Sequence, residues 1–244
     1  MQVYILDENK KTGWTGVTLE DDFTFKYIGL NHDKTAIEIV KVGAITDSRF
    51  QILFEIALNH LSRGQYRDAV VTAQAALERY REFIIRASTV KDGTHSGFNE
   101  LWKIMKKQSE RQIGAYHATI FGHTGAVGQD LSNRLISFRN EIVHNGILPE
   151  KESTTDYCTA VLEIMASGVC IFKNDHLDTL STTAMHEQEA RLPKNVDYRL
   201  TINPIVNFNM NDNDNYREIL LYHLEKLKLQ RFERIAWPNY SWII

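Results

Sequence analysis

Apolar side chains recur at alternating steps of three and four residues through the middle of the chain, and this helical spacing constrains the fold more than any other feature. The stripe is widest between residues 65 and 88. Its members are Ala69, Val70, Ala73, Ala76, Leu77, Tyr80, Phe83 and Ile84. Because several of them are alanines, a neighbouring helix can approach this face closely, and the pattern predicts one helix of a bundle.

Further segments carry the same helical spacing. The first begins behind an N-cap at Asp47 or Ser48 and stops at Gly64. The others are expected at residues 98–113, at 130–145 ahead of Gly146 and Pro149, at about 153–173, and from 216 to about 234. The glycine-punctuated residues 114–128 are expected to form a loop, and a polar segment without a predicted element follows from 174 to about 197.

Both ends of the chain carry strand signals. Residues 2–6, 22–30 and 35–42 are β-branched or aromatic runs separated by Asp, Gly and Asn clusters, which predicts a small antiparallel sheet. Residues 198–208 form a further strand candidate, which Pro204 interrupts. Three strands alone would leave an exposed edge and an uncovered face, so we expect the returning strand and the C-terminal helix to pack with this sheet.

The expected fold is therefore mainly α with a small β appendage, namely a helical bundle plus a small antiparallel sheet from the chain termini. Residues 1–45 are expected to form an N-terminal β segment and 46–175 the bundle. Residues 176–244 are expected to supply a linker, a strand and a helix that pack with the sheet. A hydrophobic content of 43% over 244 residues is ample for a buried core.

Composition narrows the possible classes of function. The net charge of −3 argues against a broad basic surface for nucleic acid, so any RNA binding should be focal. Cys158 and Cys170 lie about three turns apart in one predicted helix, and we interpret both as small core residues. None of the 9 histidines lies in a His-Glu-x-x-His pattern, so we expect no metal and no cofactor. The start MQVYILDENK lacks a signal-peptide core, and no apolar run reaches the roughly 18 residues of a membrane span, which predicts a cytoplasmic protein without membrane contact.

The most informative segment is LISFRNEIVHNGILP, residues 135–149, in which Arg139, Asn140 and His144 share one predicted helix. At about 100° per residue, Asn140 and His144 project about 40° apart and one turn from each other. Arg139 starts about 140° from His144 and must use its long stem to reach the same space. One helix can therefore present all three side chains.

Two other pairs have comparable spacing: Arg111 with His117, and Arg217 with His223. Context favours the pair on residues 130–145, because only Arg139 is followed by Asn and only His144 lies in the last turn before a glycine stop. A purely structural interpretation also exists for this pair. His144 would then hydrogen-bond the exposed carbonyls of its helix end, and Arg139 would pair with neighbours of Glu141 or with another helix.

Arginine and histidine suit RNA cleavage without a metal for physical reasons. The reaction removes a proton from a 2′-hydroxyl, protonates the leaving 5′-oxygen and builds negative charge on a phosphorane. A histidine that titrates near neutrality can serve the two proton transfers, and an arginine fork can stabilise the charge. A single histidine cannot conveniently perform both transfers in one pass, so such a site needs a second proton-transfer group.

The residues Arg139, Asn140, His144 and Gly146 resemble the R-x-x-x-x-H signature of the HEPN family, in which a polar Asn commonly follows the Arg. The alanine-rich helix resembles the earlier long helix of these domains, so the resemblance spans roughly residues 47–174. It implies a homodimer in which two motif helices line one RNA-cleaving cleft. It also implies a toxin–antitoxin or phage-defence setting with an antitoxin or regulatory partner protein. In members controlled by tyrosine modification, that tyrosine stands two residues after the motif His, where this chain has Gly146.

Other candidate residues have a functional and an ordinary interpretation. The basic face formed by Lys103, Lys106, Lys107 and Arg111 would hold RNA phosphates, although such clusters are usually solvated surface. Glu78, on the alanine-rich helix, would orient the site or else form a surface ion pair. The C-terminal WPNYSWII would stack on bases or else pack on the sheet.

Three functions therefore compete. The leading one is a metal-independent endoribonuclease that cleaves RNA through attack by its 2′-hydroxyl. The second is a catalytically silent module of the same family that binds nucleotides or a partner protein, with the terminal sheet as the docking surface. The third is a helical scaffold, which would be preferred if Arg139 and His144 faced apart.

Overall fold

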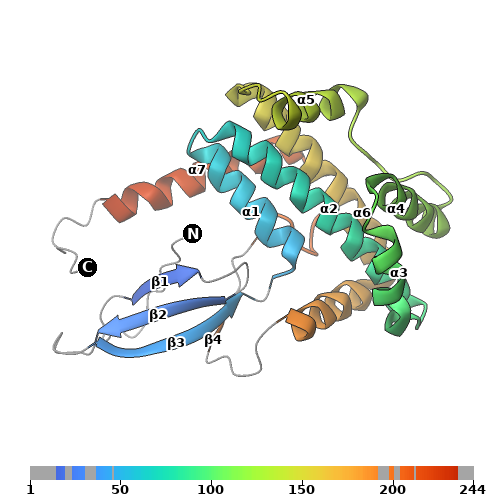
Figure 1. The fold of residues 1–244 in the computed structure, drawn as a ribbon, viewed down its shortest axis with the longest axis horizontal. Coiled ribbons are helices and arrows are strands. Elements are labelled where there is room, and N and C mark those ends of the chain that lie inside the picture. The colour runs from blue at the N-terminus through green and yellow to red at the C-terminus, as the bar shows by residue number, and fades with distance from the viewer. Residues whose placement is uncertain are drawn as a thin grey trace.

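The chain is mainly helical, as expected. The computed structural model describes residues 15–19, 24–30, 37–45, 47–191, 198–200, 204–211 and 213–235. Figure 1 shows its helices, which are α1 (Arg49–Ser62), α2 (Tyr66–Lys91), the short 3₁₀ helix η1 (His95–Gly97), α3 (Phe98–Met105), α4 (Ser109–Thr124), α5 (Asn133–His144), α6 (Lys151–Arg191) and α7 (Tyr216–Ile235). The helix that carries the sequence motif and the C-terminal helix begin and end close to their predicted positions.

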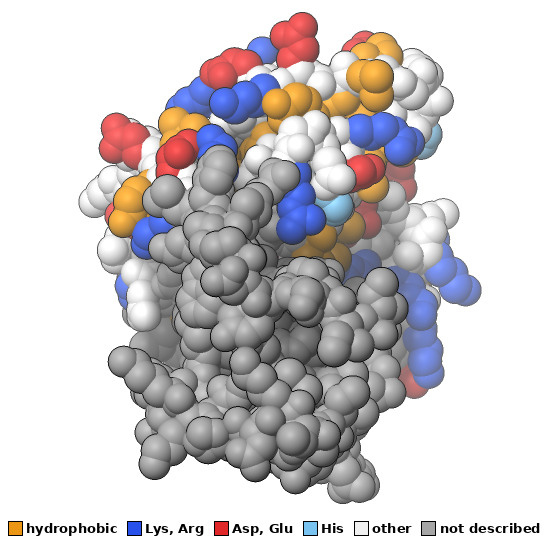
Figure 2. Space-filling view, turned by 90° about the vertical axis from the view of Figure 1, so that its left-hand side faces the viewer, with side chains coloured by type: hydrophobic (Ala, Val, Ile, Leu, Met, Phe, Trp, Pro, Cys, Tyr) orange, Lys and Arg blue, Asp and Glu red, His pale blue; other side chains and the backbone are white. Residues whose placement is uncertain are grey.

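The surface carries charges of both signs. On the face shown in Figure 2, acidic, basic and apolar side chains of the described residues are interspersed and form no extended patch of one sign. This distribution fits the net charge of −3, and the described residues on this face form no broad electropositive surface.

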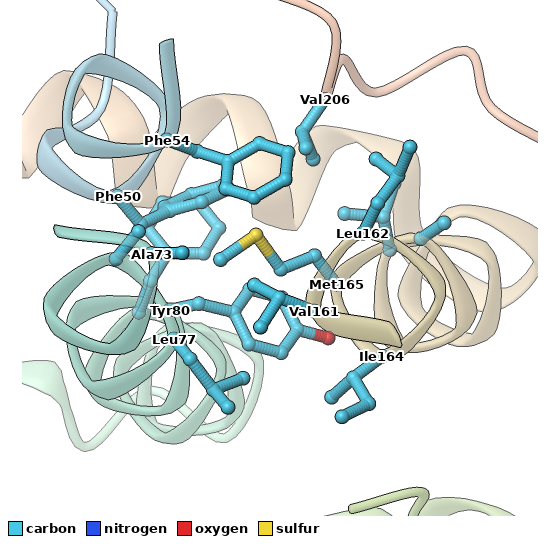
Figure 3. Close-up of a cluster of buried hydrophobic side chains, with 14 of the residues drawn as sticks. Phe50, Phe54, Ala73, Leu77, Tyr80, Val161, Leu162, Ile164, Met165 and Val206 are labelled. Atoms are coloured by element: carbon cyan, nitrogen blue, oxygen red, sulfur yellow. The ribbon is translucent and has the colours of Figure 1, made fainter. Parts of the chain in front are cut away.

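The core lies between α1, α2 and α6, which pack side by side. Figure 3 shows Phe50 and Phe54 of α1, Tyr80 of α2 and Met165 of α6 pointing toward one another, with Val206 closing one side. All five are buried. At about 25 cal/mol per Å² of apolar surface, this burial is the main stabilising contribution to the bundle.

The start of α1 is fixed by a capping contact. The Ser48 backbone N–H donates to Oε1 of Gln51, at 2.8 Å, which satisfies one of the unpaired donors at the helix N-terminus. Gly64, at φ +76°, then lets the chain reverse into α2. The predicted boundaries of this first helix are confirmed.

The prediction for residues 98–128 was wrong. We expected one helix at 98–113 and a loop at 114–128, whereas the chain breaks at 106–108 and continues as α4 to Thr124. Gln112, Tyr116 and Ile120 are buried at helical spacing, so packing on the core overrides the helix-weakening glycines. A Cβ added at Gly114 would meet no atom within 4 Å, so Gly114 lies on the outer face of α4.

The polar segment after residue 173 is also helical, contrary to expectation. It extends α6 to Arg191, and Leu180 and Thr183 are buried along it. Oε1 of Glu187 accepts a hydrogen bond from the backbone N of Arg49, at 3.1 Å. A carboxylate at the N-terminus of α1 is favourable because it meets unpaired N–H donors and the positive end of the helix dipole.

The first half of α6 is as apolar as a membrane-spanning helix. Residues Lys151–Lys173 have the length and composition of such a span, but 72% of the most apolar window is buried within the protein. This is the environment of a core helix, and Cys158 and Cys170 both lie buried in it.

The strands are β1 (Thr15–Leu19), β2 (Thr24–Leu30), β3 (Ile37–Ile45) and β4 (Tyr198–Leu200), in the order β1-β2-β3-β4. The first three pair antiparallel, and β4 pairs parallel to β3, with Ala44 opposite Arg199. The strand expected at residues 2–6 lies outside the described residues. That both flanks form one appended unit stays a prediction, as do the domain boundaries.

Residues 204–211 and α7 do not lie where we expected them. Instead of continuing a strand, Ile205 and Val206 are buried against the bundle. Gln51 Nε2 donates to the Val206 carbonyl at 2.8 Å, and the Ile205 N donates to Oε1 of Glu55 at 2.6 Å. Nε2 of His223, in α7, lies 2.9 Å from Oε2 of Glu55. The main described contacts of α7 are accordingly with α1 and α6, rather than with the strands.

We predict that Gly168→Ala destabilises the protein. A Cβ at this position in α6 would overlap the hydroxyl of Tyr80, so α2 and α6 would have to separate. Overpacking of this kind costs about 1 to 3 kcal/mol of the free energy of unfolding. Gly114→Ala is the matched control, because its Cβ meets nothing, and it should raise stability by about 0.5 to 1 kcal/mol. Urea unfolding of both variants measures the difference, and a Gly168→Ala protein as stable as wild type would contradict the close packing.

Candidate functional site

Helix α5 carries the three motif residues and has well-defined ends. The Ser132 side chain accepts a hydrogen bond from the Leu135 N, at 3.4 Å, at the start. The helix ends at His144, and Gly146 follows at φ +70°, a conformation that glycine adopts without strain. Ile142 is buried on the inner side. The predicted position of this helix is therefore confirmed.

The loop before α5 is anchored to the bundle through Asp130. Its Oδ1 accepts from Nη2 of the buried Arg81, at 2.5 Å, and also from the Leu131 N at 2.7 Å. Nε2 of His117, in α4, lies 3.4 Å from its other carboxylate oxygen. Because breaking an ion pair whose arginine is buried is costly, these contacts hold the beginning of α5 in one place against α2 and α4.

Arg139 faces the bundle and is half-buried. Its Nε is enclosed, and Arg139 makes no hydrogen bond or ion pair with another residue that the structure describes. The neighbouring Phe138 ring packs against Tyr157 of α6, with centroids 6.0 Å apart. Burial raises the pKa of Tyr157, and the positive charge of Arg139 opposes this rise.

His144 lies on the solvent side of α5. It is exposed, as are Ser137 and Val143, whereas Asn140 is half-buried. Figure 1 shows α5 at the periphery of the bundle. The structure thus brings the three motif residues onto one helix, with Arg139 toward the bundle and His144 toward solvent. Among the described residues, no hydrogen bond joins one of the three to another.

A chain of hydrogen bonds joins Tyr157 of α6 to α2. The Tyr157 hydroxyl donates to Oε1 of Gln74, at 2.7 Å, and Nε2 of Gln74 donates to Oε1 of Glu78, at 2.9 Å. Tyr157 is fully buried, and Gln74 and Glu78 are half-buried on successive turns of α2. Glu78, considered from the sequence as an orienting residue, is therefore held in a network that ends at Tyr157.

Sequence reasoning missed most of these neighbours. Arg81 is separated from Asp130 by 49 residues, and Gln74 from Tyr157 by 83, so no local pattern links them. The only local signal was that Gln, Glu and Arg residues lie beside the apolar stripe of α2. A solvent-exposed helix face carries the same residue types, so this signal did not predict the contacts.

The competing pair on α7 has structural partners. Arg217 donates to Oδ1 of Asp156, at 2.6 Å, and also contacts Glu152. His223 is engaged with Glu55. These contacts join α7 to α6 and α1, which agrees with the ordinary interpretation of this pair.

The basic face of α3 and α4 is exposed, as a solvated surface would be. Lys103, Lys106, Lys107 and Arg111 all reach solvent. Lys103 pairs with Glu100 at 2.7 Å, and Arg111 donates to the Ile104 carbonyl at 3.4 Å. Figure 1 shows α3 at the other end of the bundle from α5. This placement favours the solvated-surface interpretation over a phosphate track beside the motif.

The described residues hold no group of three or more His, Cys, Asp or Glu side chains placed to bind a metal ion. What the site offers is a cation without an acceptor, an exposed imidazole and an amide on one rigid helix. Chemically, such a set can bind an oxyanion and transfer protons.

Comparisons with known proteins gave no match: no family model matches the chain, and neither a curated protein nor a solved structure does. The function is therefore argued from α5 and its neighbours.

Proposed function

We propose that the protein is a metal-independent endoribonuclease of HEPN type, with Arg139, Asn140 and His144 as its catalytic residues. The observation that carries the proposal is the state of these side chains on α5. Arg139 has no acidic partner among the described residues, and His144 is exposed at the end of a helix that Asp130 anchors. A purely structural Arg–His pair would be expected to have partners, as Arg217 and His223 do.

Arg139 is suited to bind phosphate. A guanidinium that no carboxylate neutralises retains its full charge for a ligand, and partial burial strengthens its interaction with an anion. Its task in cleavage is to stabilise the negative charge that grows on the phosphorane. Asn140, one position further, would position the phosphate through its amide.

His144 is suited to transfer protons because it is exposed next to this cation. The 2′-hydroxyl loses its proton to a neutral imidazole, and the 2′-oxygen attacks phosphorus. The bond to the 5′-oxygen breaks, and that oxygen takes a proton from an imidazolium. The products are a 2′,3′-cyclic phosphate and a 5′-hydroxyl. Both protons are accounted for when one imidazole acts as base and another as acid.

The second imidazole would come from a second copy of the chain. Because His144 faces solvent, a twofold axis near α5 would place two His144 side chains in one cleft. The exposed Ser137, Val143 and Asn133 on the same helix would then contact the partner copy. The homodimer is thus part of the proposed mechanism.

One observation favours the third function, a helical scaffold. Within one chain, Arg139 turns toward the bundle and His144 toward solvent, which is the arrangement expected of a scaffold. A site shared by two copies overcomes the separation of Arg139 and His144 only if the partner copy supplies the group that one chain lacks. RNA cleavage by the pure protein separates the enzyme from both alternatives.

The biological setting follows from the resemblance alone. We propose a cytoplasmic toxin or phage-defence effector that cleaves RNA and is restrained by an antitoxin or other regulatory protein, without a membrane role. Gly146 stands where the modified tyrosine of some such toxins would be, so this control is not proposed here.

We predict a twofold dimer at micromolar concentration, because the composite site needs two motif helices. Sedimentation velocity measures the mass. Ser137→Cys should form a disulfide with its own copy under mild oxidation, and Glu100→Cys on α3, which is also exposed, should not. Cys158 and Cys170 are buried and do not compete. A monomer throughout this range would count against the composite site.

We predict that His144→Ala and Arg139→Ala each lower RNA cleavage roughly 10²-fold or more, since each removes proton transfer or charge stabilisation. Stability should barely change, because neither truncation opens a core cavity. Asn140→Ala should lose less. His223→Ala is the control: it leaves Glu55 without its imidazole and should lower the melting temperature while cleavage persists. Full activity in His144→Ala would refute the site.

We predict that cleavage persists in EDTA and leaves cyclic or 3′-phosphate ends with 5′-hydroxyls, because the nucleophile is the RNA's own 2′-hydroxyl. End-group analysis of total RNA incubated with the pure protein tests this. A substrate with a single 2′-deoxy position at the cleavage site should resist. Strict metal dependence, or 5′-phosphate ends, would exclude the mechanism.

A further inference from the structure

A charged cavity lies where the start of α1, the second half of α2, α3 and the end of α6 meet. Its volume is about 160 Å³. The charged and amide side chains among its described lining residues are Arg49, Arg79, Arg86, Glu82, Glu187 and Asn99. None of them belongs to α5, and Figure 1 shows α3 at the other end of the bundle from that helix. The cavity is therefore separate from the motif.

Two of the arginines are held in place by aromatic rings. Arg79 and Arg86 lie seven positions apart on α2, about two turns, and so project from the same side of the helix. Cζ of Arg86 lies 4.0 Å from the centroid of the Phe98 ring, and Cζ of Arg79 lies 5.8 Å from that of Trp102. Both rings are buried in α3 and stack on each other. A guanidinium stacked through its face keeps its N–H edge for hydrogen bonds.

One carboxylate serves both of these cations. Oε2 of Glu82 accepts from Nη1 of Arg79 at 2.5 Å, and its Oε1 lies 3.6 Å from Nη2 of Arg86. Two guanidiniums around one carboxylate leave an excess of one positive charge on α2. Burial raises the pKa of Glu82, and the two arginines oppose this rise. Where Glu82 takes up a proton, both guanidiniums lose the charge of this counter-ion.

The third arginine comes from the first turn of α1. The backbone N of Arg49 donates to Oε1 of Glu187 at 3.1 Å, which brings the end of α6 to the N-terminus of α1. Arg49 and Glu187 add one charge of each sign. The described lining therefore carries three arginines against two glutamates, and the excess of one positive charge remains. The positive end of the α1 dipole acts in the same direction.

We propose that this cavity binds a phosphoryl group, either as inorganic phosphate or as the phosphate end of a small phosphomonoester. The proposal goes beyond RNA cleavage and does not depend on it. An ionic network that only tied helices together would be expected to balance its charges and to fill its space. This one retains a positive charge and a cavity. Guanidinium forks match the paired oxygens of a phosphate, and the amide of Asn99 adds a further donor.

The size of the cavity indicates how much of the ligand it encloses. At about 30 Å³ per water molecule, 160 Å³ corresponds to roughly five waters, which is room for a phosphate group. Pockets that enclose a whole drug-sized ligand measure about 300 to 1,000 Å³. The remainder of a phosphomonoester would therefore extend into solvent, and recognition would rest on the phosphate.

Phosphorus NMR and thermal unfolding of the full chain test the proposal at constant ionic strength. The probes are inorganic phosphate, adenosine 5′-monophosphate, adenosine and acetate. The first two should raise the melting temperature, because a ligand that binds only the folded state stabilises it, and should broaden or shift their own ³¹P signals. Adenosine and acetate should do neither. Tighter binding of the monophosphate than of phosphate would identify a phosphomonoester as the ligand, and the reverse order would identify free phosphate.

Substitutions locate the binding. Arg79→Gln and Arg86→Gln should each weaken phosphate binding about tenfold or more, since each removes charge-assisted hydrogen bonds. Arg67→Gln is the matched control, because Arg67 is an exposed arginine of α2 outside the cavity lining, and it should bind as wild type does. If the arginine variants fail to fold, Ala190→Leu decides. It adds bulk at an exposed lining position near the end of α6, without a change of charge, and should abolish binding while the melting temperature without ligand stays close to wild type.

Several results would overturn the proposal. One is the absence of any effect of phosphate and of the monophosphate at millimolar concentration. Another is equal binding of acetate or adenosine, which would exclude recognition of a phosphoryl group. Unchanged binding in Ala190→Leu, or an equal loss in Arg67→Gln, would place the bound phosphate elsewhere on the protein. RNA cleavage is not measured in these experiments, so their outcome and that of the proposed function are independent.

Discussion

The close approach of α2 and α6 is the constraint on which the rest of the structure depends. Gly168 leaves room for the Tyr80 hydroxyl on one side, and the alanines of α2 give α1 a flat surface on the other. Because α2 touches α1, α4, α5 and α6, a wider separation of α2 and α6 would displace all of these helices. Interiors packed at crystal-like density transmit such shifts rather than absorb them.

The same contact sets the position of the candidate site. α5 contacts α2, and its Phe138 ring packs against Tyr157 of α6, so residues of these two helices support it. Arg81 of α2 fixes the start of the helix through Asp130, and Tyr157 of α6 lies under its middle. A helix held at two points by the core has a defined orientation, which is what a site with residues on a single helix requires.

Periodicity predicted the helices whose apolar face is complete within the sequence, such as α1, α2, α5 and α7. It failed at α4 and at the second half of α6, where glycines or polar residues hide the helical pattern and burial of a few side chains such as Tyr116 and Leu180 decides the structure. The motif on α5 was visible because its residues are close in sequence. Tyr157, Gln74 and Asp130 were not, because their pairing exists only after α2, α6 and the loop before α5 have come together.

Arg139 and His144 lie on different sides of α5, and this arrangement limits what a catalytic site built from one helix can do. An arginine must be partly desolvated to bind phosphate strongly, which draws it toward the bundle, whereas a proton-transfer histidine must reach the substrate and solvent. Five residues along a helix correspond to about 140° of rotation, so one chain satisfies both needs only by placing the groups on different sides. A second copy of the chain can place its own α5 against the exposed side of the first. The two kinds of group then meet, while Arg139 stays partly buried and His144 stays accessible. The spacing of the motif and the need for a dimer are thus, in this proposal, two aspects of the same helical geometry.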